Sequence, residues 1–198
     1  MDIRKLRGLG IVGAAGAIFR KFVYRRAEMG FYEVTRDDVK RVQPHGYTSE
    51  IHPLAKVSLD LLQNPYVTEE DLASVRSHED AHCVLVRWED EVVASNWYLA
   101  GAVPVPELSR RVELPSKVFY SCRIYVAPEH RGQHLMAYMM TSFINERPDL
   151  RGFCAFIFDW NTPSIRGVVN AGWRRTGTYR STWVLGVQRS GESRVVTT

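Results

Sequence analysis

The sequence has few cysteines. Only three occur among its 198 residues, Cys83, Cys122 and Cys154. All three lie in or beside apolar runs that are typical of strands, and none has the spacing of a metal ligand. The odd number also argues against a disulfide framework. We therefore expect buried, reduced thiols and a reducing compartment, which places the protein in the cytoplasm.

The chain also lacks a long hydrophobic run near its N-terminus. The uncharged, mostly apolar stretch at residues 8–19 is too short to cross a bilayer as a helix. Basic residues lie on both sides of it, and positive charge after such a stretch opposes export. We interpret residues 1–30 as a retained basic arm or helix that packs on its own domain. The alternative is a peripheral membrane contact or a partner contact through residues 1–26.

Charge is unevenly distributed along the chain, although the formal net charge is only +4. Residues 1–26 carry +6, residues 27–109 carry −9 and residues 110–198 carry +7. The basic C-terminal half would attract a cofactor with several phosphates. No RNA- or DNA-binding motif accompanies this charge, so nucleic acid is not an expected partner.

The composition, with 45% hydrophobic and 24% charged residues, is that of one soluble globular domain. We expect an α/β (α+β) domain over residues 31–187 and a flexible tail over 188–198. Residue patterns predict strands at 31–34, 83–88, 92–99, 118–126, 152–160 and 173–186, and helices after Thr35, around 54–62, at 69–77, from 135 and from 163. The connection at 101–116, with three prolines, is expected to be a substrate-side loop.

Residues 118–140 combine a strand, a tight turn and the start of a helix. Aromatic and β-branched residues run into Ala127-Pro128, and Arg131-Gly132 then precedes apolar residues at helical spacing. The first N–H groups of such a helix, and the positive end of its dipole, can hold an anion such as phosphate. The alternative is an ordinary connection with a solvated arginine.

Two motifs in this half resemble those of a known family. The order V-x-P-x-x-R-G-x-x-L, beginning at Val126, resembles the acyl-CoA-binding motif of the GNAT superfamily of N-acyltransferases. The segment from Asn161 to Trp173 is similar to the second motif of that family, an N-x-x-S-I-R helix closed by glycine and an aromatic residue. The resemblance covers residues 118–186. It implies a mixed, mostly antiparallel central sheet flanked by helices, with strands that splay apart at the cofactor site.

The same resemblance implies acetyl-CoA or another acyl-CoA as cosubstrate, and no metal. The cofactor-binding residues that it implies are Tyr125, Val126, Arg131, Gly132, Gln133, His134, Leu135, Met136, Asn161 and Ser164. His134 and Met136 stand where the family usually has small residues. Val168 stands where many members have the tyrosine that protonates the leaving thiolate, so the general acid is unassigned.

The catalytic base is also open, because the strand at 118–126 carries no Asp or Glu. Tyr120 could relay a proton through water, and Arg123 could bind a carboxylate on the acceptor. Each could equally be a packing residue or a paired strand residue, and solvent could take the proton instead.

The expected function is acyl transfer from acyl-CoA to an amine of a small molecule or peptide. One alternative uses long-chain acyl-CoA or acyl carrier protein as donor, and another is a catalytically degenerate CoA-binding module. A remote alternative is a zinc metalloprotease, because His78-Glu79-x-x-His82 matches H-E-x-x-H. Zinc ligation would require a helix that persists through His82. Residues 83–88 have a strand pattern instead, so we expect no metal there.

Overall fold

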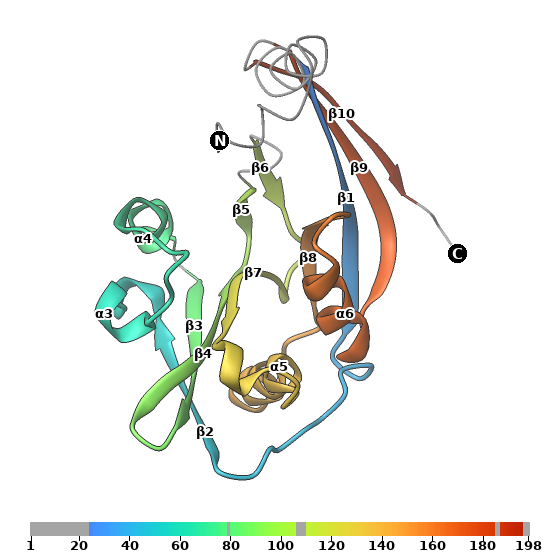
Figure 1. Ribbon diagram of the computed structural model, residues 1–198. Coiled ribbons are helices and arrows are strands. Elements are labelled where there is room, and N and C mark those ends of the chain that lie inside the picture. The colour runs from blue at the N-terminus through green and yellow to red at the C-terminus, as the bar shows by residue number, and fades with distance from the viewer. Residues whose placement is uncertain (1–23, 79, 106–109, 185–186, 196–198) are drawn as a thin grey trace, which may run out of the picture.

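A computed structural model describes residues 24–78, 80–105, 110–184 and 187–195 (Figure 1). Within these ranges the main sheet has eight strands in the order β10-β9-β1-β8-β7-β4-β3-β2. The strands are β1 Tyr24–Thr35, β2 Tyr47–Pro53, β3 Ala81–Trp88, β4 Glu91–Leu99, β7 Val118–Val126, β8 Gly152–Phe158, β9 Arg174–Val184 and β10 Val187–Val195. Neighbouring strands are antiparallel except for β7 and β8, which run parallel. The predicted mixed, mostly antiparallel sheet is confirmed.

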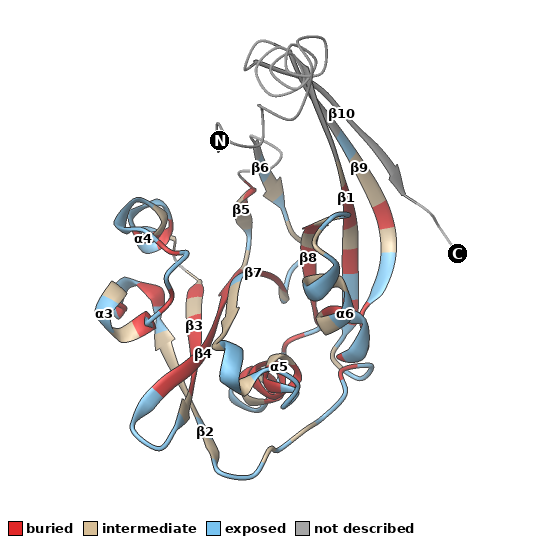
Figure 2. Cartoon of the chain, in the orientation of Figure 1, coloured by how far each residue is buried: buried red, intermediate tan, exposed pale blue. Residues whose placement is uncertain are grey.

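Helices cover both faces of this sheet (Figure 1). The elements on one face are η2 Leu54–Lys56, α3 Leu59–Leu62 and α4 Glu69–Arg76, and those on the other are α5 Leu135–Glu146 and α6 Thr162–Asn170. Each face has its own apolar cluster. Phe143 of α5 packs with Phe119 and Phe153 of the sheet in one cluster, whereas Leu72 of α4 belongs with Trp97 to the other. Figure 2 shows that burial is concentrated along β3, β4 and the inner side of α5.

Local signals explain several of the elements. The Thr68 side chain accepts a hydrogen bond from the Asp71 N–H at 3.2 Å, and Asp71 accepts one from the Thr68 N–H at 3.0 Å. This capping box starts α4 where the sequence predicted it. The β3–β4 hairpin is also confirmed, and its turn places Glu89 at φ +53°.

The parallel pair β7–β8 is short. It pairs Val118, Phe119 and Tyr120 with residues 152–154 and then stops. Beyond that point β7 remains paired with β4, and β8 remains paired with β1 along its whole length. Among the described strands, none fills the edges that face each other at 121–126 and 155–158. The two strands therefore splay apart, as the family resemblance implied (Figure 1).

The boundaries of the domain differ from the prediction at both ends. Strand β1 begins at Tyr24 rather than at Phe31, and it pairs with β8 on one edge and β9 on the other. The expected tail at 188–198 contributes β10, which pairs with β9. Backbone pairing stabilises both segments although their sequences show little apolar alternation. The rest of the basic arm, residues 1–23, lies outside the described residues.

Three further segments also differ from the prediction. Residues 36–39 form a turn rather than a helix. Directly after this turn the Lys40 N–H donates a hydrogen bond to the Ala171 carbonyl at 3.2 Å, so the backbone pairs with a distant segment instead of with itself. Strand β2 was not predicted. The expected loop at 101–116 contains a hairpin of β5 Ala102–Val105 and β6 Arg110–Glu113. Val103 and Val105 bury their side chains in the α3–α4 face, an alternation that the prolines had obscured.

Candidate functional site

The turn between β7 and α5 is tighter than the sequence suggested. The short helix η4 spans Pro128–His130, and the Arg131 N–H donates to the Pro128 carbonyl at 3.3 Å. The Arg131 N–H is therefore already used within the turn. The first bond of α5 runs from the Tyr138 N–H to the His134 carbonyl at 3.0 Å. The N–H groups of residues 135–137 consequently have no acceptor inside the helix.

This helix start also carries no compensating group. His134 is the N-cap residue, and its side chain makes no capping hydrogen bond. The first turn of α5 contains no acidic residue. A helix of 12 residues without a cap leaves the positive end of its dipole open to an external anion.

Gly132 shapes the approach to that helix. Its φ is +83°, a value that favours glycine, and a Cβ built on it would meet nothing within 4 Å. Its role is therefore conformational, since no protein atom requires the absence of a side chain. Gln133 and His134 are exposed and Met136 is half-buried, whereas Leu135 is buried in the core. Leu135 thus anchors the helix rather than lining the site.

Asn161 follows the open end of β8 and caps α6. Its side-chain oxygen accepts a hydrogen bond from the Ser164 N–H at 3.3 Å. Pro163 lies in the first turn of α6, a position that needs no backbone donor. Asn161 and Ser164 are both half-buried. Val168, farther along α6, is buried in the apolar cluster on the α5 face. The position at which the resemblance implied a thiolate-protonating tyrosine is therefore a core position in this chain.

The two catalytic candidates lie in different surroundings. Tyr120 is 4% exposed at the last β7–β8 pair, and its ring centroid is 6.0 Å from that of Phe156. The structure therefore places Tyr120 in the core rather than in a water-lined site. Arg123 is exposed, but its guanidinium lies 2.5 Å from the Asp71 carboxylate. This arginine already has a carboxylate partner within the chain.

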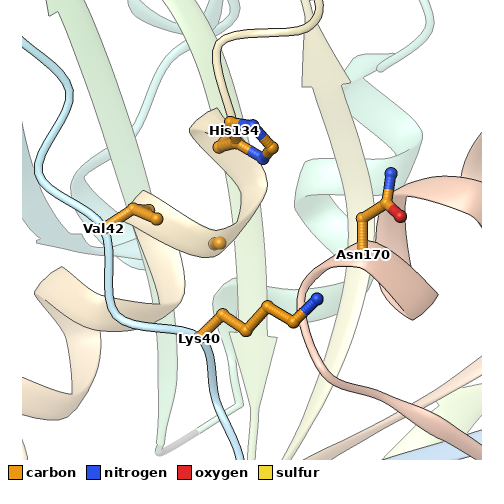
Figure 3. Close-up of a pocket in the computed structure, with 5 residues that line it drawn as sticks. Lys40, Val42, His134 and Asn170 are labelled. Atoms are coloured by element: carbon orange, nitrogen blue, oxygen red, sulfur yellow. The ribbon is translucent and has the colours of Figure 1, made fainter.

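A hollow of about 270 Å³ lies beside the start of α5 (Figure 3). It is lined by Lys40, Val42, His134, Ala137 and Asn170. Figure 3 shows the Lys40 side chain extending toward α6, where Asn170 lies. The sequence offered no signal for Lys40, because it stands in a loop 94 positions before His134.

Two of the three thiols, those of Cys83 and Cys154, are buried as the sequence predicted, whereas that of Cys122 is not. Burial raises the pKa of the Cys83 and Cys154 thiols far above their ordinary value, so both remain protonated and unreactive. Cys122 is half-buried at the splay. No disulfide joins the cysteines in the described part of the chain.

The H-E-x-x-H match does not form the helix that zinc ligation requires. Helix α4 ends at Arg76, and His82 lies in β3. Nε2 of His82 is 2.8 Å from Asp80, which also pairs with Arg147 at 2.9 Å. Nε2 of His78 is 3.3 Å from the Ala102 carbonyl oxygen. In the described ranges, which omit Glu79, no group of three His, Cys, Asp or Glu residues is placed to hold a metal ion. No helix in the same ranges is long and apolar enough to span a membrane.

Comparison with known proteins agrees with this geometry. The sequence model of the acetyltransferase (GNAT) family matches residues 49–167. No curated protein sequence matches the chain. A GCN5-related N-acetyltransferase from Kribbella flavida has a TM-score of 0.52 at 15% identity, over 84% of this chain and 62% of that one.

Two further solved structures share the fold. A GCN5-related N-acetyltransferase from Sphaerobacter thermophilus has a TM-score of 0.54 at 14% identity, over 87% of this chain and 56% of that one. A tandem GNAT protein from the clavulanic acid biosynthesis pathway has a TM-score of 0.55 at 13% identity, over 89% and 60%. This chain therefore spans about three fifths of the length of these proteins. With more than half of its residues matched by the family's sequence model, the chain belongs to the GNAT family of acetyltransferases.

Proposed function

We propose that this protein transfers an acetyl or other acyl group from acyl-CoA to an amine of a small molecule or peptide. The observation that carries the proposal is the divergence of β7 from β8 next to the uncapped start of α5. An open strand edge and an open helix N-terminus together suit a donor with an amide-containing arm and a diphosphate.

The residues that would hold the donor follow from this placement. Tyr125 and Val126 lie on the part of β7 that is open toward β8, where backbone groups that point away from β4 can pair with the amides of the arm. The Val126 carbonyl itself already accepts a hydrogen bond from the Arg131 side chain at 3.3 Å. The diphosphate would lie at residues 132–134 and the start of α5, where the N–H groups of residues 135–137 have no intrahelical partner. Lys40, in the hollow beside His134, would supply charge for a further phosphate. Asn161 would border the arm from the β8 side.

The chemistry requires the amine to attack the thioester carbonyl carbon, the C–S bond to break, the amine to lose a proton and the thiolate to gain one. Strand β7 carries no Asp or Glu, and both Tyr120 and Val168 are buried. The chain therefore contributes mainly by orienting the thioester and by polarising its carbonyl through backbone N–H groups. Proton exchange with solvent completes the step.

A second candidate donor carries a long acyl chain, on CoA or on acyl carrier protein. Half-buried aromatic residues lie together on the α3–α4 face of β8, β1 and β9, beginning next to Tyr120. Ring centroids of Phe31 and Phe156 are 4.8 Å apart, and those of Phe156 and Tyr179 are 5.0 Å apart. Such a surface would bury an apolar chain that emerges from the splay.

Calorimetry tests the donor assignment directly, with CoA compared against dephosphorylated pantetheine. Tighter binding of CoA is expected, and equal affinities would mean that the helix start is no phosphate site. A turnover assay that measures thiol release distinguishes the two candidate donors. It compares acetyl-CoA, long-chain acyl-CoA and acylated carrier protein, each with a panel of amines. Binding of CoA without turnover of any donor would favour a catalytically degenerate binding module.

A further inference from the structure

We propose that Arg123 is a positioning residue that fixes the open edge of β7, where the donor arm lies. Its backbone is left-handed, and residues 64–71 hold it from two directions. The inference rests on the proposed function, because it assigns a role in donor binding to a residue outside the motifs.

The first observation is a bulge in β7. Ser95 of β4 lies opposite Tyr125, and Trp97 lies opposite Cys122, so one residue of β4 faces two residues of β7. Arg123, the first of those two, has φ +53°. Residues other than glycine adopt this conformation rarely, and they keep it only where their surroundings enforce it.

The second observation is what enforces it. The Arg123 guanidinium pairs with the Asp71 carboxylate at 2.5 Å, and the Arg123 carbonyl accepts a hydrogen bond from Asn64 Nδ2 at 3.5 Å. Both partners are themselves fixed. Asp71 accepts from the N–H and the hydroxyl of Thr68 at 3.0 Å each. Asn64, only 7% exposed, accepts from the Tyr66 N–H at 3.0 Å.

A third contact comes from the same segment. The Tyr66 ring lies edge-on to that of Tyr125, with centroids 6.1 Å apart. Three contacts from the α3–α4 region thus converge on residues 123–125 of β7.

The bulge coincides with the loss of strand pairing. The last β7–β8 pair involves Tyr120, three positions before Arg123. A bulge bends its strand and increases the local twist. The conformation at Arg123 therefore directs residues 124–126 away from β8 and presents their open edge to the donor. Loss of the Asp71 contact would let this segment relax toward ordinary strand geometry.

The test compares Arg123→Ala with Arg123→Gly by calorimetry with CoA. Alanine retains the energetic penalty of a left-handed backbone but loses the ion pair with Asp71 that enforces this conformation. CoA should therefore bind about tenfold more weakly, a loss that corresponds in free energy to the strain of one such residue. Glycine adopts a left-handed conformation freely, so Arg123→Gly should recover most of the lost affinity. Arg76→Ala is the matched control, because it removes an arginine from α4 that pairs with Glu69 at 3.2 Å. Its affinity should equal that of the wild type.

Asp71→Asn provides an independent variant, since asparagine retains an oxygen for the Thr68 cap but loses the charge. It should weaken CoA binding in the same direction as Arg123→Ala. Combined with Arg123→Gly it should add little, because the pair is already absent. Thermal melts confirm that each variant is folded at the temperature of the titration.

The outcomes separate the two claims. If the wild type binds no CoA, the donor assignment fails, and this role fails with it. If the wild type binds CoA and Arg123→Ala binds it equally well, the positioning role alone is wrong. The role is also wrong if Arg123→Gly is as weak as Arg123→Ala, because the guanidinium rather than the backbone would then be required.

Discussion

Gly132 offers the sharpest test of the α5 start as an anion site. A Cβ at this position meets no atom within 4 Å, so Gly132→Ala introduces no clash. Its cost comes from φ +83° alone and should be about 1–2 kcal/mol, the usual penalty for an L-residue in a left-handed conformation. If the turn relaxes to escape that penalty, the N–H groups at the helix start no longer converge on one anion. CoA affinity should then fall by roughly tenfold.

The chain contains a matched control. Gly101 has φ +72°, and a Cβ at this position would likewise meet nothing within 4 Å, but the residue lies in the connection between β4 and β5. Gly101→Ala should therefore lower the free energy of unfolding by a similar amount without affecting CoA. Gly132→Glu should weaken CoA binding further than Gly132→Ala, because it adds a negative charge that costs about 1 kcal/mol at roughly 4 Å from an anion in water.

Chemical denaturation measures the stability of these variants, and calorimetry measures their affinity for CoA. Equal CoA affinities for Gly101→Ala and Gly132→Ala would refute the reasoning, since the helix start would then have no special role. Unchanged affinity in Gly132→Glu would refute it independently.

Three other outcomes are expected. Deletion of residues 1–23 should leave a cooperatively melting domain. Deletion of residues 1–35 should give insoluble protein, because it removes β1 from between β8 and β9. A soluble fragment of residues 36–198 that melts cooperatively would contradict this. Asn161→Ala should lower the free energy of unfolding by about 1 kcal/mol, whereas Asn161→Ser should retain most of the stability because serine can also cap α6. Equal denaturation midpoints for the two variants would show that the cap is unimportant. Protein purified without added metal should contain no stoichiometric zinc, and zinc that is lost on His82→Ala would overturn the assignment of that motif.

Local signals accounted for the parts of the fold that were predicted well. The observed limits of β7, Val118–Val126, are those predicted from its aromatic and β-branched residues. The Thr68 cap began a helix at the expected residue because both members of a capping box lie within one turn. The prediction that β7 and β8 splay rested on family resemblance, since no property of either strand alone encodes where their pairing stops.

Distant partners decided what the sequence could not show. Arg123 was a candidate for binding an acceptor carboxylate until its partner proved to be Asp71, 52 positions earlier. Tyr120 had suitable chemistry, but its burial depends on how β7 packs against the α3–α4 face. Pairing in the sheet, rather than side-chain pattern, recruited residues 24–30 and 187–195.

The sequence by itself determined the strand, turn and helix that make up the proposed donor site, because turn chemistry and helix spacing act over a few residues. Only the tertiary structure decided that the helix start lies beside an open strand edge and beside Lys40. It alone decided that a bulge at Arg123 is held from another part of the chain. Contacts between segments that are far apart in sequence arise only when the sheet assembles, and those contacts support the proposal that this turn is a binding site.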